Sequence, residues 1–520
     1  FVTFAHQLGI KVFADIVVNH TADVIYYLDG TSYSGTPKAP LVPSNMTHAK
    51  QPDWLNNTVN YHNRGDIDWN SCVGACLQLG DFSGLDDLAT EKPLVWQGLA
   101  DTYSTFARTF HLDGFRIDTA RHVDDAFFNR FIPRVGAAMK SAGNPGFTEF
   151  GELYVPDMSV QQDYMTRRGL PSVLDFVYQK SVLAYVTGIG SGRTLARMFD
   201  QDDEYTTPTG NAYGLATFLG NHDMGRIGFL LKSNSSATGN TLVAMDLLAH
   251  DILYLTRGVP IVYYGDEVGM TGSGDGTDKN ARQDMFATQV TQWQSESRIG
   301  SPAVGTSSGF DQTATNPIAA RLQLLASIRA SDPALASGAQ INRLGAGAVY
   351  VESKIDRGQR REYVVAFNQG PTSSTVSFQT STPSSSWSTL LGPSGVRTSR
   401  ANGTLTVTVP ARGTLVLKAS RLLPTAPKPS VTLAVAQNYN RGTYQLTATI
   451  PGLDPASVTF AYRVKGSSTW VRLGTDDARP FRVQLDPLKF RAGTKVDLLA
   501  VGRSSSGAYA ASRLAPLTIT

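Results

Sequence analysis

Cysteine, charge and long apolar runs are all scarce in this sequence. Its 520 residues include only two cysteines, and no cysteine or histidine cluster has the spacing of a zinc site. Charged residues make up 17% and the net charge is +3, so we expect no nucleic-acid partner. The most apolar window, DILYLTRGVPIVYYG, is interrupted by Arg257 and Pro260. It falls short of the roughly 20 residues that span a bilayer, so we expect no membrane segment.

The two cysteines stand close together in CVGAC, as Cys72 and Cys76. We interpret them as a small loop disulfide, with two free thiols as the alternative. The low charge and the abundance of glycine, serine and threonine are typical of a secreted protein, and extracellular localisation is our expectation. The chain length predicts two to four domains.

Apolar runs and helix-like stretches alternate over residues 1–331. Six runs predict buried strands, and the stretches between them predict helices, which is the pattern of βα units around a parallel sheet. After the first run, residues 21–92 are rich in Asn, Gly, Pro and Asp, and we interpret them as an inserted subdomain. The six runs are KVFADIVVN, GFRID, FTEFGEL, SVLDF (172–176), LATFLGN and VPIVYYG.

The remainder of the chain changes to alternating strands without helical periodicity. Residues 332–419 predict an all-β domain, and 420–430 form a proline-rich linker. Residues 431–520 have strand spacing typical of an immunoglobulin- or fibronectin-like β-sandwich. In this last domain Tyr439, Tyr462 and Trp470 either bind polysaccharide or belong to the core of a spacer.

Polar residues follow four of the predicted strands where each strand ends. They are Asn19 and His20, then Asp118, Glu152, and finally His222 with Asp223. In a parallel α/β barrel the functional groups lie at these carboxyl ends. A single carboxylate there is explained equally well as a helix N-cap. Three carboxylates and two imidazoles at equivalent positions favour a site.

Two neighbouring carboxyl groups, one ionised and one protonated, are what retaining cleavage of a glycosidic bond requires. Arg116 lies two residues before Asp118, on the same face of a strand, and therefore keeps that carboxylate ionised. The general acid of such a pair has to hold a proton near neutral pH, so we expect it in a less solvated place than the nucleophile.

The segments DIVVNH, GFRIDTARH, GELY and FLGNHD resemble the four ordered motifs of the α-amylase superfamily, glycoside hydrolase family thirteen. The resemblance extends through GVPIVYYGDE and covers roughly residues 1–330. It implies a (β/α)8-type TIM barrel that cleaves α-1,4-glucosidic bonds in starch, glycogen or maltodextrins through a covalent intermediate. An α-glucan is then the partner, and we expect a monomer.

The same resemblance assigns roles to individual residues. It implies that Asp118 is the nucleophile, Glu152 the acid/base, and Asp223 a third carboxylate that stabilises the transition state. Substrate contacts follow for Arg116, His20, His222, Arg121 and His122. Cyclodextrin- or pullulan-hydrolysing and transglycosylating relatives share this set. A non-catalytic carbohydrate-binding homologue is the alternative from another class.

A structural calcium ion is also implied by the resemblance. Its ligands would be the Asn19 side chain, Asp87 in LDDL and the backbone carbonyl of His122, all oxygen donors that suit Ca²⁺. Asp86 stands where the family usually has proline, and Asp81 is a further candidate. The alternative is a set of hydrogen-bonded loop acids without a metal.

Some features are left open or depart from the family. The family's first motif lies on its third barrel strand but begins here near residue 11. We therefore expect a fragment that lacks the first two strands and is inactive by itself. Asp278 and Arg282 either contact sugar or pair with each other. Trp54, Tyr61 and Trp69 either stack on sugar rings or form the subdomain core.

Overall fold

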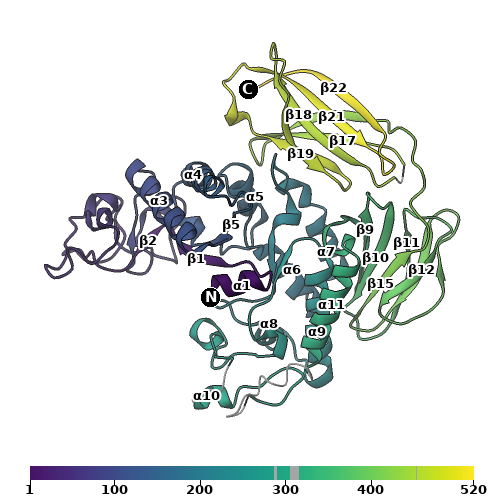
Figure 1. Ribbon diagram of the computed structural model, residues 1–520, viewed down its shortest axis with the longest axis horizontal. Helices are drawn as coiled ribbons and strands as arrows, with labels where there is room; N and C mark the ends of the chain where they lie inside the picture. Colours follow the sequence, from purple (N-terminus) through teal and green to yellow (C-terminus); the bar gives the residue numbers. More distant parts are fainter. Residues whose placement is uncertain (286–289, 305–315, 453) are drawn as a thin grey trace. The chain divides into compact units, whose positions relative to one another are not determined.

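The computed structural model describes residues 1–285, 290–304, 316–452 and 454–520. Residues 286–289 and 305–315, which fall within the predicted catalytic domain, lie outside the described residues. The chain divides into two compact units, Phe1–Leu174 (unit 1) and Asp175–Thr520 (unit 2), and each is described by itself (Figure 1). Within the described ranges, no helix has both the length and the apolarity needed to cross a membrane.

Unit 1 is built around a parallel sheet with strand order β1-β4-β5. Asp15 of β1 lies opposite Arg116 of β4, and Ile117 of β4 lies opposite Gly151 of β5. Gly114 is required where β1 and β5 flank β4, because a Cβ there would lie 2.2 Å from the Phe13 ring and 2.3 Å from the carbonyl oxygen of Thr148. The strands are β1 Phe13–Val17, β4 Gly114–Asp118 and β5 Thr148–Gly151.

Helices cover this sheet and follow the apolar periodicity of the sequence. In α3 (Pro93–Phe110) the buried residues Val95, Leu99 and Ala100 recur at helical spacing, and Pro93 occupies the first turn. The helix ends at His111, whose φ is 54°. The other helices of unit 1 are α1 Val2–Gln7, α2 Cys76–Leu79, α4 Phe127–Ser141 and α5 Met158–Thr166.

The segment 21–92 contains little regular structure. Its short strand β3 (Asp86–Asp87) pairs antiparallel with β2 (His20–Thr21), so the segment starts and ends beside the end of β1. The expected disulfide is confirmed, because Cys72 and Cys76 are joined. Tyr61 is 3% exposed and belongs to the core of the segment, whereas Trp69 is half exposed.

The strand predicted over residues 172–176 is confirmed in part. Val173 makes a parallel bridge to Gly151, and the backbone of Gly151 donates to Ser172 at 3.0 Å and accepts from Leu174 at 2.9 Å. The pairing is short because Phe176 already begins helix α6 (Phe176–Val186), and the Asp175 carboxylate caps this helix by accepting a hydrogen bond of 2.9 Å from the backbone N–H of Tyr178.

Unit 2 begins with helices and a pair of parallel strands. Strand β6 (Ala216–Phe218) pairs with β7 (Val259–Ile261), and the long buried helix α9 (Gly239–Leu255) runs between them. The remaining helices are α7 Gly192–Phe199, α8 Ile227–Ser233, α10 Thr291–Gln294, α11 Pro317–Ser331 and α12 Ala334–Ser337.

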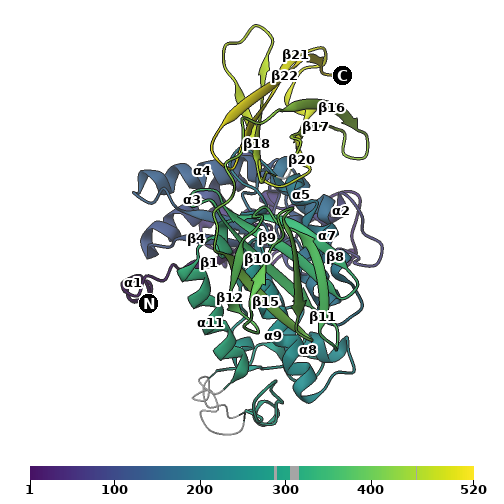
Figure 2. The same ribbon diagram turned by 90° about the vertical axis from the view of Figure 1, so that its right-hand side faces the viewer.

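An all-β region follows in unit 2. A sheet of order β13-β12-β15-β10-β9-β8 and the pair β11-β14 enclose a core that includes Val351, Val364 and Trp387 (Figure 2). Its strands are β8 Ala339–Ala346, β9 Val349–Asp356, β10 Arg361–Asn368, β11 Ser374–Gln379, β12 Ser386–Leu391, β13 Arg397–Thr398, β14 Thr404–Val409 and β15 Gly413–Ala419.

The last strands form a two-sheet sandwich. Sheets β16-β17-β20 and β19-β18-β21-β22 enclose one core that includes Leu446, Phe460 and Leu498. Tyr462 packs at the edge of this core against Phe490. The strands are β16 Thr432–Asn438, β17 Thr443–Thr449, β18 Ser457–Val464, β19 Val471–Asp476, β20 Phe481–Leu485, β21 Lys495–Arg503 and β22 Tyr509–Thr518.

Candidate active site

Two predicted acids lie at the same level on neighbouring strands of unit 1. Asp118 is the last residue of β4 and Glu152 directly follows β5, and the backbone N–H of Glu152 donates to the Ile117 carbonyl at 2.8 Å. The backbones of neighbouring strands are about 4.8 Å apart, so the two acids project from adjacent positions at the same end of the sheet.

A single guanidinium group joins these acids. Nη1 of Arg116 lies 2.7 Å from Oδ1 of Asp118, and Nη2 lies 3.0 Å from Oε1 of Glu152. Nη1 also donates to Asp15 at 2.7 Å. The Arg116 side chain is 13% exposed, and these carboxylates raise its pKa above the ordinary value although burial opposes them. Arg116 therefore remains a fixed cation between the two acids.

The two acids differ in solvation as the sequence predicts. The side chain of Glu152 is 6% exposed and that of Asp118 is 25% exposed. Oε2 of Glu152 also accepts a hydrogen bond of 3.3 Å from the backbone N–H of Thr119. Thr119 has a φ of 48°, an unfavourable value for a β-branched residue, directly after Asp118. Such backbone strain clusters at functional sites.

His20 and Asn19 follow β1 and are held by short contacts. Nδ1 of His20 donates to Oδ1 of Asn19 at 2.7 Å, which leaves Nε2 as an acceptor. Burial lowers the pKa of His20, and the charge of Asp118 partly opposes this, so the ring is neutral. The ring stacks on Phe82 with centroids 5.5 Å apart. The inserted segment thus fixes the orientation of His20.

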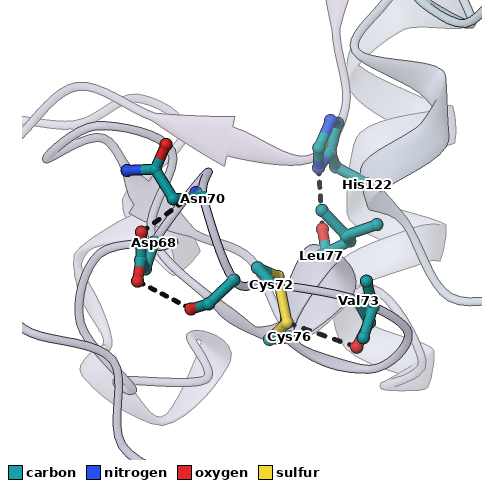
Figure 3. Close-up of a disulfide and its surroundings, with 8 residues drawn as sticks. Asp68, Asn70, Cys72, Val73, Cys76, Leu77 and His122 are labelled. Atoms are coloured by element: carbon teal, nitrogen blue, oxygen red, sulfur yellow. Dashed lines mark hydrogen bonds between the residues drawn. A yellow bond between two sulfur atoms is a disulfide. The ribbon is translucent and has the colours of Figure 1, made fainter.

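His122 faces the inserted segment. Its Nδ1 donates to the Leu77 carbonyl at 2.7 Å, beside the Cys72–Cys76 disulfide (Figure 3). Its ring makes edge contacts with Trp69 and Phe82, at 5.7 and 5.2 Å. Burial lowers its pKa to about 4, so the ring is neutral at working pH.

Arg121, the other member of the basic pair, is half-buried, and its carbonyl accepts a hydrogen bond from the hydroxyl of Tyr164 at 3.0 Å. This contact fixes the backbone beside His122. It uses only the carbonyl of Arg121 and does not involve its guanidinium group.

Unit 2 carries the remaining predicted residues after β6. Asp223 is about one third exposed, and its Oδ2 lies 3.2 Å from Nε2 of His222. Nη2 of Arg282 lies 3.1 Å from Oδ1 of Asp223 and 2.7 Å from Oδ1 of Asp278. Asp278 and Arg282 therefore pair with each other, which is one of the two alternatives, and Arg282 also holds Asp223.

One of the predicted calcium ligands, Asp87, has a carboxylate oxygen without a hydrogen-bond partner among the described residues. Asp87 is 1% exposed, and its Oδ1 has no hydrogen-bond partner among the described residues, while His62 occupies Oδ2. Burial raises the pKa of Asp87 to about 8 although His62 opposes the change. Within the described ranges, no three side chains of His, Cys, Asp or Glu cluster as a metal site. A cation here would depend on the Asn19 amide and the His122 carbonyl.

Two residues of this site escaped the sequence analysis. Asp15 binds Arg116 because the register of β1 and β4 places them opposite each other. The sequence signal that could have identified Asp15 is an acid in the middle of an apolar strand. Phe82 contacts both His20 and His122, but no periodicity in the inserted segment marks it.

Two family profiles match the chain. The alpha amylase catalytic domain matches residues 1–316, and the alpha amylase C-terminal all-beta domain matches residues 355–420. The chain belongs to the alpha-amylase family. The catalytic domain therefore contains the Asp118–Arg116–Glu152 arrangement of unit 1 and the Asp223 loop of unit 2.

Relatives of this alpha-amylase family member agree with the assignment. An alpha-amylase of Streptomyces lividans is 38% identical over 98% of this chain and 59% of its own length. A beta/alpha-amylase of Paenibacillus polymyxa is 30% identical over 54% of this chain and 21% of its own. The chain thus spans less than two thirds of each of these relatives.

A solved structure shares the fold. The alpha-amylase of Geobacillus thermoleovorans, crystallised with acarbose, has a TM-score of 0.60 and 22% identity. The match covers 81% of this chain and 79% of that chain. The alpha-amylase fold, a catalytic domain followed by an all-β domain, therefore describes this chain.

Proposed function

We propose that the protein is a retaining glycoside hydrolase that cleaves α-1,4-glucosidic bonds in starch, glycogen or maltodextrins. The observation that supports it most is the Arg116 guanidinium, which lies within 3.0 Å of both Asp118 and Glu152. The same cation contacts both acids and fixes them side by side, and the two acids differ in solvation, which suits the more exposed Asp118 to act as nucleophile and the less exposed Glu152 as acid/base.

In the first step the Asp118 carboxylate attacks the anomeric carbon of the glucose unit. Glu152 transfers its proton to the glycosidic oxygen as that bond breaks, and a covalent glycosyl ester on Asp118 forms. In the second step Glu152, now ionised, takes a proton from water. The resulting hydroxide attacks the anomeric carbon, which frees Asp118 and leaves the product with its original configuration.

Neighbouring polar groups favour the transition state over the bound substrate. The sugar ring becomes cationic in this state, so carboxylates stabilise it more than they stabilise a neutral sugar. We assign this role to Asp223, which is about one third exposed and held by Arg282. The free Nε2 of neutral His20 accepts a hydrogen bond from a sugar hydroxyl, and His222 has the same family role.

The Glu152→Gln variant tests this assignment. Glutamine has nearly the same shape as Glu152 but cannot donate the proton, so hydrolysis should fall by at least about 10³-fold. An activated aryl glucoside, whose leaving group needs no proton, should form the glycosyl-enzyme at a much less reduced rate. Near-normal hydrolysis of starch by this variant would exclude Glu152 as the acid.

Reaction products distinguish members of the family. Hydrolysis of amylose to maltooligosaccharides supports an alpha-amylase, whereas cyclic products or transfer to added glucose support a transglycosylase. Cleavage of pullulan or cyclodextrins would favour the relatives with those substrates. Binding of glucan without turnover would favour a non-catalytic homologue, and we expect turnover because all three acids are present.

We further propose a structural Ca²⁺ held by the Asn19 amide oxygen, Oδ1 of Asp87 and the His122 carbonyl. Oδ1 of buried Asp87 lacks a hydrogen-bond partner among the described residues, which suits an oxygen ligand, whereas Oδ1 of Asn19 would bind the ion beside the hydrogen bond that it accepts from His20. When bound, the ion supplies positive charge that joins the inserted segment to the ends of β1 and β4. It takes no part in the proton transfers.

Fold, localisation and assembly complete the proposal. We infer that β1, β4, β5, β6 and β7 belong to a (β/α)8-type barrel. Secretion is consistent with the half-buried Cys72–Cys76 disulfide, since such bonds persist outside the cytosol. We propose a monomer, which size-exclusion chromatography with light scattering can test.

A further inference from the structure

The final sandwich contacts the rest of unit 2 through sheet β16-β17-β20 and through the end of β19, where Tyr213 donates to Asp477 at 3.1 Å. On sheet β16-β17-β20, Nη2 of Arg482 donates to Asp203 at 3.0 Å and Nε2 of Gln484 donates to Glu204 at 2.9 Å. Arg441, in the turn between β16 and β17, lies 2.9 Å from Glu204. These contacts anchor one sheet to the segment after α7. The outward face of the other sheet, β19-β18-β21-β22, is on the opposite side of the sandwich core.

Side-chain alternation identifies the residues on this second face. Val458 and Phe460 of β18 and Leu498 and Ala500 of β21 are fully buried in the core. The residues between them therefore point outward. Cross-strand pairing adds outward residues from β19 and β22: Arg472 lies opposite Ala461, Arg513 opposite Leu499, and Tyr509 opposite Arg503. We call this surface the arginine face.

The arginine face carries a clear excess of positive charge. Its guanidinium groups come from Arg463, Arg472, Arg503 and Arg513. The outward positions of these four strands include one carboxylate, Asp497, which lies 2.8 Å from Nε of Arg463. Among the described residues, the other three arginines have no carboxylate within ion-pair distance. A partner with negative charges would complement this surface.

Aromatic rings hold several of these guanidinium groups in place. Those of Arg463 and Arg513 lie 4.9 and 5.6 Å from the centroid of the Trp470 ring. That of Arg503 lies 5.5 Å from the Tyr509 ring, and Tyr509 is 56% exposed. Stacking of this kind orders a guanidinium group for paired hydrogen bonds to an anion. The two guanidinium groups also cover the Trp470 ring, so this ring is not available for stacking on a neutral sugar.

We propose that the arginine face binds a glucan that carries phosphate ester groups. The phosphates bind Arg472, Arg503 and Arg513, whose planar donors suit phosphate oxygens. The sugar rings contact the half-buried Leu499 and Val501 between these arginines. That the polymer is a glucan rests on the proposed function. Nucleic acid fits less well, because apolar side chains interrupt the charge and the whole chain has a net charge of only +3.

Affinity electrophoresis in phosphorylated amylopectin can test this proposal. The matched gel contains the same polymer after phosphatase treatment, so the difference in retention excludes binding of neutral glucan by the catalytic domain. Asp118→Asn protein prevents digestion of the gel. The test variant combines Arg472→Gln, Arg503→Gln and Arg513→Gln. The control variant changes the exposed Arg400, Arg421 and Arg491 to glutamine, which removes the same charge elsewhere.

The unmodified face should bind the phosphorylated polymer at least about 10-fold more tightly than the dephosphorylated one. The test variant should lose this difference, and the control variant should keep it. Equal retention in both gels, or an unchanged test variant, would overturn the proposal. Stronger retention by duplex DNA than by the phosphorylated polymer would also overturn it. If the proposed hydrolase function fails instead, starch turnover is absent while the phosphate-dependent difference remains.

Discussion

The Arg116→Met variant removes the cation that Asp118, Glu152 and Asp15 share. Methionine fills similar space without charge, so the carboxylates are left close together with no compensating group. The side chains of Arg116 and Glu152 are 13% and 6% exposed, so this is a largely buried pair. Loss of one partner of a buried ion pair costs about 3–5 kcal/mol. Asp15 is 53% exposed and adds little.

A domain of the size of unit 1 loses about 2–4 °C in Tm per kcal/mol, so we expect Tm to fall by about 6–20 °C. Activity should fall at least about 10²-fold, because the guanidinium group that contacts both acids no longer fixes their positions. Thermal unfolding by circular dichroism and kcat on maltoheptaose measure these effects.

Two further variants sharpen the test. Arg116→Lys keeps the charge but not the planar fork that reaches both acids, and an intermediate loss of activity is expected. Asp15→Asn removes only the exposed acid and should retain most activity. If Arg116→Met unfolds within about 1 °C of the unmodified protein and keeps its activity, Arg116 does not organise the acids and the reasoning is refuted.

Three other perturbations have defined outcomes. Glu149 is 4% exposed with Oε1 unpartnered among the described residues, and burial raises its pKa to about 7. Its folded-state pKa is above the unfolded value, so its contribution to stability is complete at low pH and is lost as pH rises toward 7. Glu149→Gln should therefore raise the unfolding free energy by up to about 3 kcal/mol at pH 8 and not at pH 4, and an equal effect at both would refute this. Chelation with EGTA should lower Tm, and Ca²⁺ should restore it in the unmodified protein but not in Asn19→Ala; no response in either would remove the proposed ion. Arg282→Ala should lower kcat/KM about 10-fold because Asp223 loses its partner, whereas Arg400→Ala should have no effect.

Much of the candidate site could be predicted because it depends on local regularities. Short apolar runs identified the strands that end at Asp118 and near Glu152, and the parallel arrangement implied that these ends meet. The difference in their solvation also followed from the chemistry that each acid must perform. These predictions needed only strand type and direction.

Other features depended on contacts between distant segments. Arg116 binds Asp15 because of the register between β1 and β4, which no single segment encodes. Phe82 stacks on His20 from an irregular segment without periodicity. The strand predicted at 172–176 is shorter than expected, because the start of a helix cannot be distinguished from the end of a short apolar run, and the Asp175 cap decided where the pairing stops.

The nucleophile assignment can be measured directly by trapping the covalent intermediate. A fluorinated glucosyl fluoride reacts readily but hydrolyses slowly, so the glycosyl-enzyme accumulates and can be digested and sequenced by mass spectrometry. The account predicts one added hexose unit on the peptide that contains Asp118, and no label in Asp118→Asn. A label on Glu152 or Asp223, or turnover with inverted configuration and no label, would contradict it.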